Sequence, residues 1–481
     1  MLTEKTIIEL ANLLEKGETS AEEIIKEYIK RINTIDKKIN AYITFDDEKA
    51  IIDAKESDKR RKKGAHLSRY DGIPIAIKDN ICTKGIQTSC ASGILKDFVP
   101  PYDATSIVKI KEMGFIILGK MNMDEFAMGS STETSYFGPT KNPYNLERVP
   151  GGSSGGSAAA VSAMIAPAAL GSDTGGSIRL PSSFCGVVGI KPTYGRVSRY
   201  GLVAFASSLD QIGTIARTVD DAALLLKVIS GSDKKDSTSI ERDNDFTDEL
   251  DGQIEDMIIG IPKEYFDSVS SDIHECIFTR INQLERMGAR IKEISLKYTE
   301  YAIPIYYLIA SAEASSNLSR YDGIRYGTRS NNASEIIDIY KKSRSEGFGK
   351  EVKRRIILGT YALSSGYYDA YYLKALKGRS LIIDDFKNVF SKVDVILSPS
   401  STTTAFRIGE KINDPLEMYI MDILTISANL AAIPSLSVPV GLDSNKLPVG
   451  LQIMGNHLQE KKILNMAKAV ESICDPIHPE V

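Results

Sequence analysis

Histidine is scarce in this chain, and that scarcity limits how a serine could be activated. The 481 residues include only four histidines. His274 and His457 lie in charged, helical patterns, and His478 is three residues from the last residue. A hydrolase whose serine depends on a histidine base is therefore disfavoured.

Cysteine and long apolar runs are also limited. The five cysteines are odd in number and form no C-x-x-C pair, so we expect reduced, structural thiols rather than disulfides or a zinc site. No stretch approaches 18 consecutive apolar residues, and residues 1–17 form an amphipathic pattern of mixed charge rather than a signal peptide. We expect a cytoplasmic protein without a membrane span.

A strong excess of basic charge is missing as well. The chain has 59 basic and 63 acidic residues, for a net charge of −4, and its one long basic run is Lys59–Lys63. That run is typical of a solvated helix face. Because a protein that grips RNA phosphates by itself usually has a basic face, this chain is not expected to be the main RNA-binding partner.

Glycine and serine, by contrast, are concentrated in two clusters. GGSSGGS spans residues 151–157, and TGGS spans residues 174–177. The small apolar stretch Ala158–Leu170 between them predicts a buried helix that runs into a strand, which excludes a flexible linker. Neither a P-loop lysine nor G-x-G-x-x-G is present. A G-x-S-x-G elbow fits Ser153 or Ser154, but no histidine is well placed to serve it.

A candidate base lies upstream of these clusters. Residues 71–80 read DGIPIAIKDN, a turn followed by a short apolar strand that ends at Lys78. A lysine there is usually a solvated strand terminus; alternatively, Lys78 is buried and acts as a neutral general base. That role requires its pKa to fall by about 3.4 units from about 10.4, which deep burial can supply. Asp79 need not oppose the shift, because consecutive strand residues point to opposite faces.

Together, these motifs resemble the amidase signature family. The resemblance rests on the strand that ends at Lys78, on GGSSGGS and on residues 171–198. It implies a Ser-cisSer-Lys triad in which Ser177 is the nucleophile, Ser153 is the bridging serine behind a cis Gly152–Ser153 peptide, and Lys78 is the base. Ser154 would then be a secondary hydroxyl near the bridge.

The residues around Ser177 complete this chemistry. Thr174, Gly175 and Gly176 could direct consecutive backbone N–H groups at the oxyanion of an attacked amide. Asp173 and Arg179 flank the loop, and we interpret them as a buried ion pair that holds the turn.

A narrower resemblance covers essentially the whole chain. Residues 121–143, 314–327, 345–372 and 414–425 are similar to the A subunits of glutamyl-tRNA(Gln) amidotransferases, a branch of this family. The similarity implies glutamine as substrate, with Arg355 clamping its α-carboxylate and Asp422 pairing with its α-ammonium. Arg354 competes with Arg355 for the first role. The implied pocket wall consists of Tyr306, Met128, Gly129 and Ser130.

The same resemblance implies an assembly. The B subunit would phosphorylate and amidate Glu-tRNA(Gln) with ATP and magnesium, using ammonia made by this chain. The small C subunit would wrap around the A and B subunits, which completes a heterotrimer. No cofactor or metal is then expected in this chain, and the tRNA would be held mainly by the partner. Two alternatives remain open: a free-standing amidase of the same family, and a non-catalytic scaffold.

The order of elements predicts an α/β fold of the amidase-signature type, with a mixed central sheet covered by helices on both sides. Strand-like runs lie at 73–77, 115–118, 258–261, 393–397 and 436–440. We expect a single domain over 1–481, with polar residues 230–252 as its best internal linker. Its expected parts are an N-terminal helical segment (1–60), a catalytic core (61–230), a mostly helical, tyrosine-rich substrate side (253–390) and a return to the core sheet (391–481).

Overall fold

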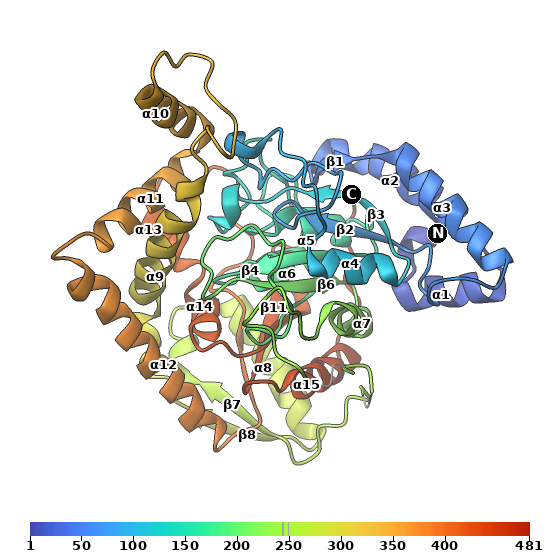
Figure 1. The fold of residues 1–481 in the computed structure, drawn as a ribbon. Coiled ribbons are helices and arrows are strands. Elements are labelled where there is room, and N and C mark those ends of the chain that lie inside the picture. Colours follow the sequence, from blue (N-terminus) through green and yellow to red (C-terminus); the bar gives the residue numbers. More distant parts are fainter. Residues whose placement is uncertain (243–244, 249) are drawn as a thin grey trace.

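A central sheet with surrounding helices organises the molecule. The structure is a computed structural model that describes residues 1–242, 245–248 and 250–481. Within these ranges a mixed sheet of 11 strands is covered by helices, which confirms the predicted α/β fold (Figure 1). The strands are β1 (Tyr42–Phe45), β2 (Pro74–Lys78), β3 (Ile116–Met121), β4 (Ala168–Asp173), β5 (Val188–Lys191), β6 (Gln211–Ala216), β7 (Ile258–Pro262), β8 (Arg290–Ile294), β9 (Val395–Pro399), β10 (Ser435–Leu442) and β11 (Pro448–Gly455).

The strand order explains how distant motifs meet. In space the strands run β1-β3-β2-β4-β6-β5-β10-β11-β9-β7-β8. Strands β2 and β4 are parallel neighbours, with Ala76 opposite Ala169 and Ile77 opposite Leu170. Because the carboxyl ends of parallel strands meet at one edge of a sheet, Lys78 at the end of β2 lies beside the residues that follow β4.

Fifteen α-helices flank the sheet in the described part of the chain. They are α1 (Ile7–Lys16), α2 (Ala21–Ile39), α3 (Asp47–Lys62), α4 (Thr105–Glu112), α5 (Gly155–Ser162), α6 (Arg179–Cys185), α7 (Val219–Ile229), α8 (Ser271–Arg286), α9 (Ala302–Asn317), α10 (Ile336–Gly347), α11 (Lys350–Ala362), α12 (Lys374–Phe390), α13 (Pro415–Ile420), α14 (Ile423–Leu430) and α15 (Glu460–Ser472). No helix in the described ranges is both long and apolar enough to cross a membrane.

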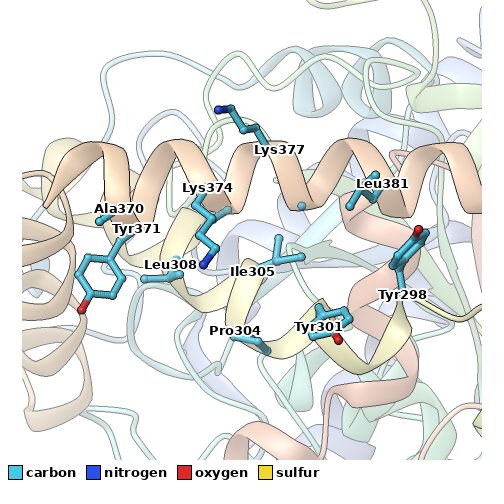
Figure 2. A pocket seen from close by; sticks show the side chains of 12 residues that line it. Tyr298, Tyr301, Pro304, Ile305, Leu308, Ala370, Tyr371, Lys374, Lys377 and Leu381 are labelled. Atoms are coloured by element: carbon cyan, nitrogen blue, oxygen red, sulfur yellow. The ribbon is translucent and has the colours of Figure 1, made fainter.

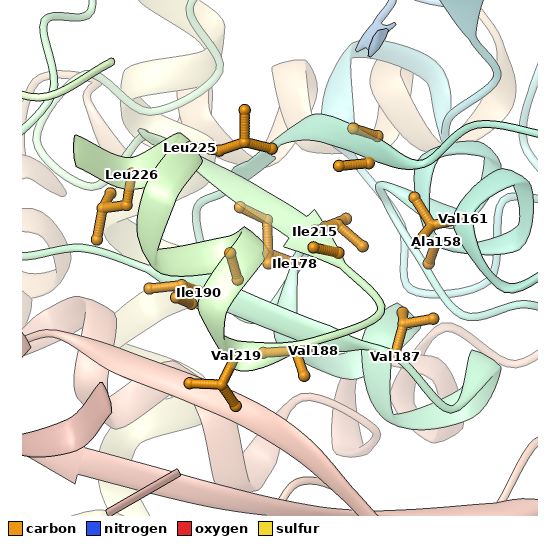
Figure 3. Packing of buried hydrophobic residues seen from close by; sticks show 14 of the residues in the cluster. Ala158, Val161, Ile178, Val187, Val188, Ile190, Ile215, Val219, Leu225 and Leu226 are labelled. Carbon is orange, nitrogen blue, oxygen red and sulfur yellow. The ribbon is translucent and has the colours of Figure 1, made fainter. Parts of the chain in front are cut away.

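Both serine clusters are anchored in the core. The small residues after Gly155 form α5, and the chain then enters β4, as predicted from the sequence. Every residue of α5 and β4 is buried. Figure 3 shows Ala158 and Val161 of α5 in the same buried cluster as Ile178 and Ile215. The backbone around the serines is therefore held by a packed core rather than by a loop.

A helical cover lies on one side of the sheet. Helices α9, α11, α12 and α13 gather at the left of Figure 1, whereas α1, α2 and α3 lie at the right. Helices α9 and α11 pack closely because Gly359 has no side chain: a Cβ there would lie 1.9 Å from the carbonyl oxygen of Ser311. This cover carries the tyrosine-rich region predicted on the substrate side.

The polar segment 230–252, which the sequence suggests as a linker, is held to the core by hydrogen bonds at its beginning. Asp233 accepts hydrogen bonds from the hydroxyls of Thr105 and Ser198, and Asp236 accepts one from the backbone N–H of Arg199. The beginning of the expected linker is therefore tied to the core. Residues 243, 244 and 249 of this segment lie outside the described residues.

Candidate active site

Lys78 is a buried lysine and not a solvated strand terminus. Its side chain is fully enclosed, and Nζ donates to Ser153 Oγ at 2.7 Å, to Ser154 Oγ at 2.8 Å and to the carbonyl oxygen of Ser172 at 3.2 Å. Burial lowers the pKa of Lys78 to about 7, although the carboxylate of Asp124 acts in the opposite direction. Near neutral pH this amine is therefore able both to accept and to return a proton.

The three serines differ in access. Ser153 follows a cis peptide bond with Gly152, as the family resemblance implies, and both Ser153 and Ser154 are fully buried. Ser177 is 8% exposed, so it is the most accessible of the three. The N–H of Ser154 donates to the carbonyl oxygen of Ser177 at 3.0 Å, which holds the two clusters together. No hydrogen bond links the Ser153 and Ser177 hydroxyls among the described residues.

The loop before Ser177 is fixed from both sides. The Thr174 hydroxyl donates to Asp210 at 2.7 Å, and the Thr425 hydroxyl donates to the carbonyl oxygen of Gly175 at 2.7 Å. The N–H of Gly176, one of three predicted oxyanion donors, already donates to Asp173 Oδ1 at 2.9 Å. Of the three predicted donors, the Thr174 and Gly175 N–H groups have no acceptor in the described part of the chain, so these two remain available to an oxyanion.

Asp173 and Arg179 form the buried ion pair expected from the sequence. Arg179 Nη2 lies 3.0 Å from Asp173 Oδ1, and both side chains are fully buried. Burial opposes ionisation of Asp173, but the Arg179 guanidinium outweighs it and keeps the carboxyl pKa below its usual range. Arg179 also donates to the side chains of Gln452 and Asn429. This network holds the turn between β4 and α6.

Arg355, rather than Arg354, faces the interior. The Arg355 side chain is 3% exposed, whereas that of Arg354 is 43% exposed. Aromatic rings surround the Arg355 guanidinium carbon: Tyr307 at 5.0 Å, Tyr419 at 5.4 Å and Phe205 at 5.5 Å. Sequence reasoning missed this aromatic cage, because its members come from three distant segments that share no local pattern.

Asp422 lies at the start of α14 and is also buried. Its Oδ2 accepts a hydrogen bond from the Ser130 hydroxyl at 2.6 Å. Burial raises the pKa of Asp422 to about 7, while the Ser130 hydroxyl and the Arg355 guanidinium act against that rise. An ammonium group bound here would favour the ionised form of this carboxyl group.

The predicted pocket-wall residues lie around the same loop. A Cβ on Gly175 would lie 2.7 Å from the Tyr306 ring, so that ring packs against the segment leading to Ser177. Met128 belongs to the same buried cluster as Tyr306. Gly129 packs against Asp124, whose carboxyl oxygen would lie 2.4 Å from a Cβ at that glycine. Of the predicted wall residues, Tyr306 is thus the one in contact with the loop that leads to Ser177.

Asp124 and Asp210 were not anticipated. Asp124 is buried, accepts the N–H of Thr132 at 2.8 Å, and lies so close to Gly152 that a Cβ there would be 2.0 Å from Oδ2. Asp210 accepts both the Thr174 hydroxyl and the N–H of Phe205. Each carboxyl group therefore fixes one loop of the site. Neither has a sequence signal, because the partners are separated along the chain.

The histidine-dependent elbow has no support in the structure. His274 stacks on Phe278 in α8, with ring centroids 4.3 Å apart. Across the described residues, no histidine bonds to Ser153 or Ser154, whose hydroxyls both accept from Lys78. In the same residues no group of three or more His, Cys, Asp or Glu side chains could hold a metal ion.

A separate apolar groove lies behind the pocket. It has a volume of about 490 Å³ and lies between α9 and α12, where Ile305, Leu308 and Leu381 line it (Figure 2). Tyr306 and Tyr307, which take part in the candidate site, come from the same helix α9. This helix is therefore the wall between the groove and the candidate site.

Comparison with known proteins gives consistent matches. The sequence model of the family described as Amidase matches residues 23–464. The A subunit of the glutamyl-tRNA(Gln) amidotransferase from Thermoanaerobacter pseudethanolicus is 58% identical over 468 residues, which cover 97% of this chain and 96% of the relative.

Solved structures agree with these sequence matches. The crystal structure of the A subunit of glutamyl-tRNA(Gln) amidotransferase from Thermotoga maritima has a TM-score of 0.83 and 43% identity, and the match covers 100% of this chain and 99% of that chain. Native peptide amidase from Stenotrophomonas maltophilia has a TM-score of 0.84 and 29% identity, with 99% of each chain covered. Because the matches span nearly its whole length, this chain belongs to the amidase family, in the branch formed by the glutamyl-tRNA(Gln) amidotransferase A subunits.

Proposed function

We propose that this chain is the glutaminase component of a glutamyl-tRNA(Gln) amidotransferase, which releases ammonia from the side-chain amide of glutamine. Its family makes it an enzyme of amide hydrolysis rather than a scaffold. The observation that carries the proposal is the contact between buried Lys78 and Ser153, 2.7 Å apart, beside the accessible Ser177. A buried amine with a pKa near neutral can replace the missing histidine.

The first half of the reaction makes an acyl-enzyme. Ser177 Oγ attacks the amide carbon of glutamine, its proton passes to Ser153 Oγ, and the Ser153 proton passes to neutral Lys78. Because no bond joins the Ser153 and Ser177 hydroxyls among the described residues, the proposal requires this link to form when substrate binds. The N–H groups of Thr174 and Gly175 stabilise the oxyanion, and each such donor contributes about 3 kcal/mol to lowering the barrier.

The second half returns the proton and releases the products. Protonated Lys78 passes a proton through Ser153 to the departing nitrogen, ammonia leaves, and a γ-glutamyl ester remains on Ser177. Water then attacks the ester with the same relay acting as base, and glutamate is released. Ser154, which accepts from Lys78 at 2.8 Å, keeps Nζ aligned without carrying the transferred proton.

The glutamine head group is held by two buried charges. Arg355 binds the α-carboxylate through its terminal nitrogens, and Asp422 binds the α-ammonium. Tyr306, Met128, Gly129 and Ser130 form the wall around the side chain. A free-standing amidase of small amides would have no use for this pair of opposite charges.

The ammonia is used by partner proteins. The relatives that this chain matches are A subunits by name, which indicates an assembly. In our proposal the B subunit activates Glu-tRNA(Gln) with ATP and magnesium and adds the ammonia, and the C subunit completes a cytoplasmic heterotrimer. The net charge of −4 is consistent with a tRNA held mainly by the partner.

The assembled complex tests this division of labour. A complex that carries Ser177→Ala should lose glutamine-dependent amidation of Glu-tRNA(Gln), yet keep amidation when an ammonium salt is supplied. The measurement is Gln-tRNA(Gln) formed with each nitrogen donor, with assembly checked by gel filtration. An intact variant complex that fails with both donors would place part of the transfer chemistry in this chain. Full glutaminase activity of the isolated chain, with no response to the partners, would favour a free-standing amidase.

The pH dependence should reveal two titrating groups. Lys78 must be neutral and Asp422 must be ionised, and each has a pKa of about 7, so both requirements are lost as pH falls. Below about pH 6, log kcat/KM for glutamine should rise with a slope of about 2, because both groups titrate in the free enzyme. Bound glutamine keeps Asp422 ionised, so the slope for log kcat should be about 1. A kcat/KM that stays flat from about pH 6 to 8 would contradict both assignments.

A further inference from the structure

Glu351 connects the residue proposed to bind the carboxylate to another helix. It lies one turn before Arg355 on α11, and its side chain is 13% exposed. Its Oε1 accepts two hydrogen bonds, from Arg355 Nε at 2.8 Å and from the Tyr419 hydroxyl at 2.9 Å. Burial opposes ionisation of Glu351, but Arg355 outweighs it and lowers the carboxyl pKa. One carboxylate oxygen therefore joins α11 to α13.

Tyr419 connects the same carboxylate to Asp422. It lies on α13, and its carbonyl oxygen accepts the Asp422 N–H at 3.3 Å. Its ring stacks on Tyr307 of α9, with centroids 3.8 Å apart and planes 25° apart. Contacts with α9 and α11 together thus set the position of Tyr419. Through its backbone hydrogen bond, Tyr419 in turn sets the position of the Asp422 backbone.

The guanidinium of Arg355 is held in one orientation, but its terminal N–H groups are still available to a ligand. Nε is used by Glu351, while Nη1 and Nη2 donate to no acceptor in the described part of the chain. Aromatic faces of Tyr307, Tyr419 and Phe205 restrict rotation of the group. The two terminal nitrogens are the ones that a carboxylate binds when it is held in the bidentate manner.

We propose that Glu351 and Tyr419 form a latch between α11 and α13 that holds Arg355 and Asp422 as one amino-acid-binding unit. This inference rests on the proposed glutaminase function and adds two positioning residues to it. Neither residue touches the reacting amide. The hydrogen bonds of Glu351 act on the substrate through Arg355, whereas the Tyr419 ring and backbone, which Tyr419→Phe leaves in place, set the position of Asp422. The latch therefore governs how tightly glutamine binds and not how fast its amide is broken.

Tyr419→Phe tests the latch with the smallest change. The ring still stacks on Tyr307, and only the hydroxyl that reaches Glu351 is lost. We expect KM for glutamine to rise about tenfold, since a hydrogen bond to a buried charge is removed, with kcat changed less than about twofold. Glu351→Ala should raise KM at least as much. The matched control is Tyr361→Phe. Tyr361 is an exposed tyrosine on α11, the helix that carries Glu351 and Arg355, and its substitution should leave both constants unchanged.

A double-mutant test distinguishes a positioning role of Tyr419 from a general disturbance of the fold. In an Arg355→Ala enzyme, which should already have a raised KM, adding Tyr419→Phe should change KM less than about twofold, because the latch acts through the missing arginine. An added tenfold loss in that background, or a fall in kcat at unchanged KM, would overturn the latch. If Arg355→Ala itself leaves KM unchanged, the proposed carboxylate clamp fails and the latch fails with it. If Arg355→Ala raises KM but Tyr419→Phe and Glu351→Ala do not, the latch alone is wrong.

Discussion

Ser177→Ala is expected to abolish glutamine hydrolysis, with a loss of more than about 10⁴-fold in kcat, because the proposed nucleophile is removed and the other two serines of the triad motifs are fully buried. Ser177 is 8% exposed, whereas Ser153 and Ser154 are fully buried behind it and accept hydrogen bonds from Lys78. Ser154→Ala should retain measurable activity, since it removes one acceptor of the Lys78 amine but leaves the proton path through Ser153 intact. The measurement is glutamate release by the two purified variants.

Covalent labelling provides an independent check of the nucleophile. An electrophilic glutamine analogue should attach to Ser177 in the unmutated enzyme, and peptide mass spectrometry should locate it there. The label should disappear in Ser177→Ala and persist in Ser154→Ala. A label found on Ser153 or Ser154 of the unmutated enzyme would instead support the elbow arrangement, despite its missing histidine.

Much of the fold could be predicted because its elements carry local signals. Ser20 and Glu23, three residues apart, form a capping box at the start of α2, with the Glu23 N–H donating to Ser20 Oγ and the Ser20 N–H to Glu23 Oε2. The Thr218 side chain caps α7 by accepting the N–H of Asp221. The small residues between the serine clusters gave α5 and β4. In each case the physical cause lies within a few residues of its effect.

The catalytic residues were suggested by a family resemblance, and the structure adds the reason why they could work. From the sequence alone, Lys78 could be interpreted either as a solvated strand end or as a buried base. Its burial and its contacts with Ser153 and Ser154 follow from the parallel pairing of β2 with β4, which the sequence did not specify. The roles of these residues remain predictions that the variants above will test.

The surroundings of the pocket could not be predicted from local pattern. Glu351 and Arg355 are four residues apart in a charged stretch that is typical of a solvated helix face, and Arg354 does face outward. What turns Arg355 inward is the set of rings from Phe205, Tyr307 and Tyr419, which are separated by more than 100 residues at each step. Likewise, the use of the Gly176 N–H by Asp173 depends on the detailed geometry of the turn.

Lys78→Arg should be nearly as damaging as Lys78→Met, with each losing about 10³-fold in kcat, because a guanidinium cannot give up its proton near neutral pH. The comparison separates two roles that a buried lysine could have. If Lys78 served only as a positive charge or hydrogen-bond donor for Ser153, arginine would preserve much of the activity and methionine would not. If it accepts the Ser177 proton through Ser153, both substitutions remove the base. The measurement is kcat for glutamine hydrolysis by folded variants.

Lys191 provides the matched control for disturbing a buried lysine. It is 1% exposed, burial lowers its pKa to about 7, and its Nζ donates to the carbonyl oxygens of Pro192 and Ile433 rather than to a serine. Lys191→Arg should therefore lower the unfolding temperature while kcat stays within about threefold of the unmutated enzyme, since mutations away from the reacting groups act mainly on stability. Substantial activity in Lys78→Arg would rule out the proton-accepting role. A loss of kcat in Lys191→Arg as large as that in Lys78→Arg would show that the loss reflects a disturbed core, and it would then no longer support Lys78 as the base.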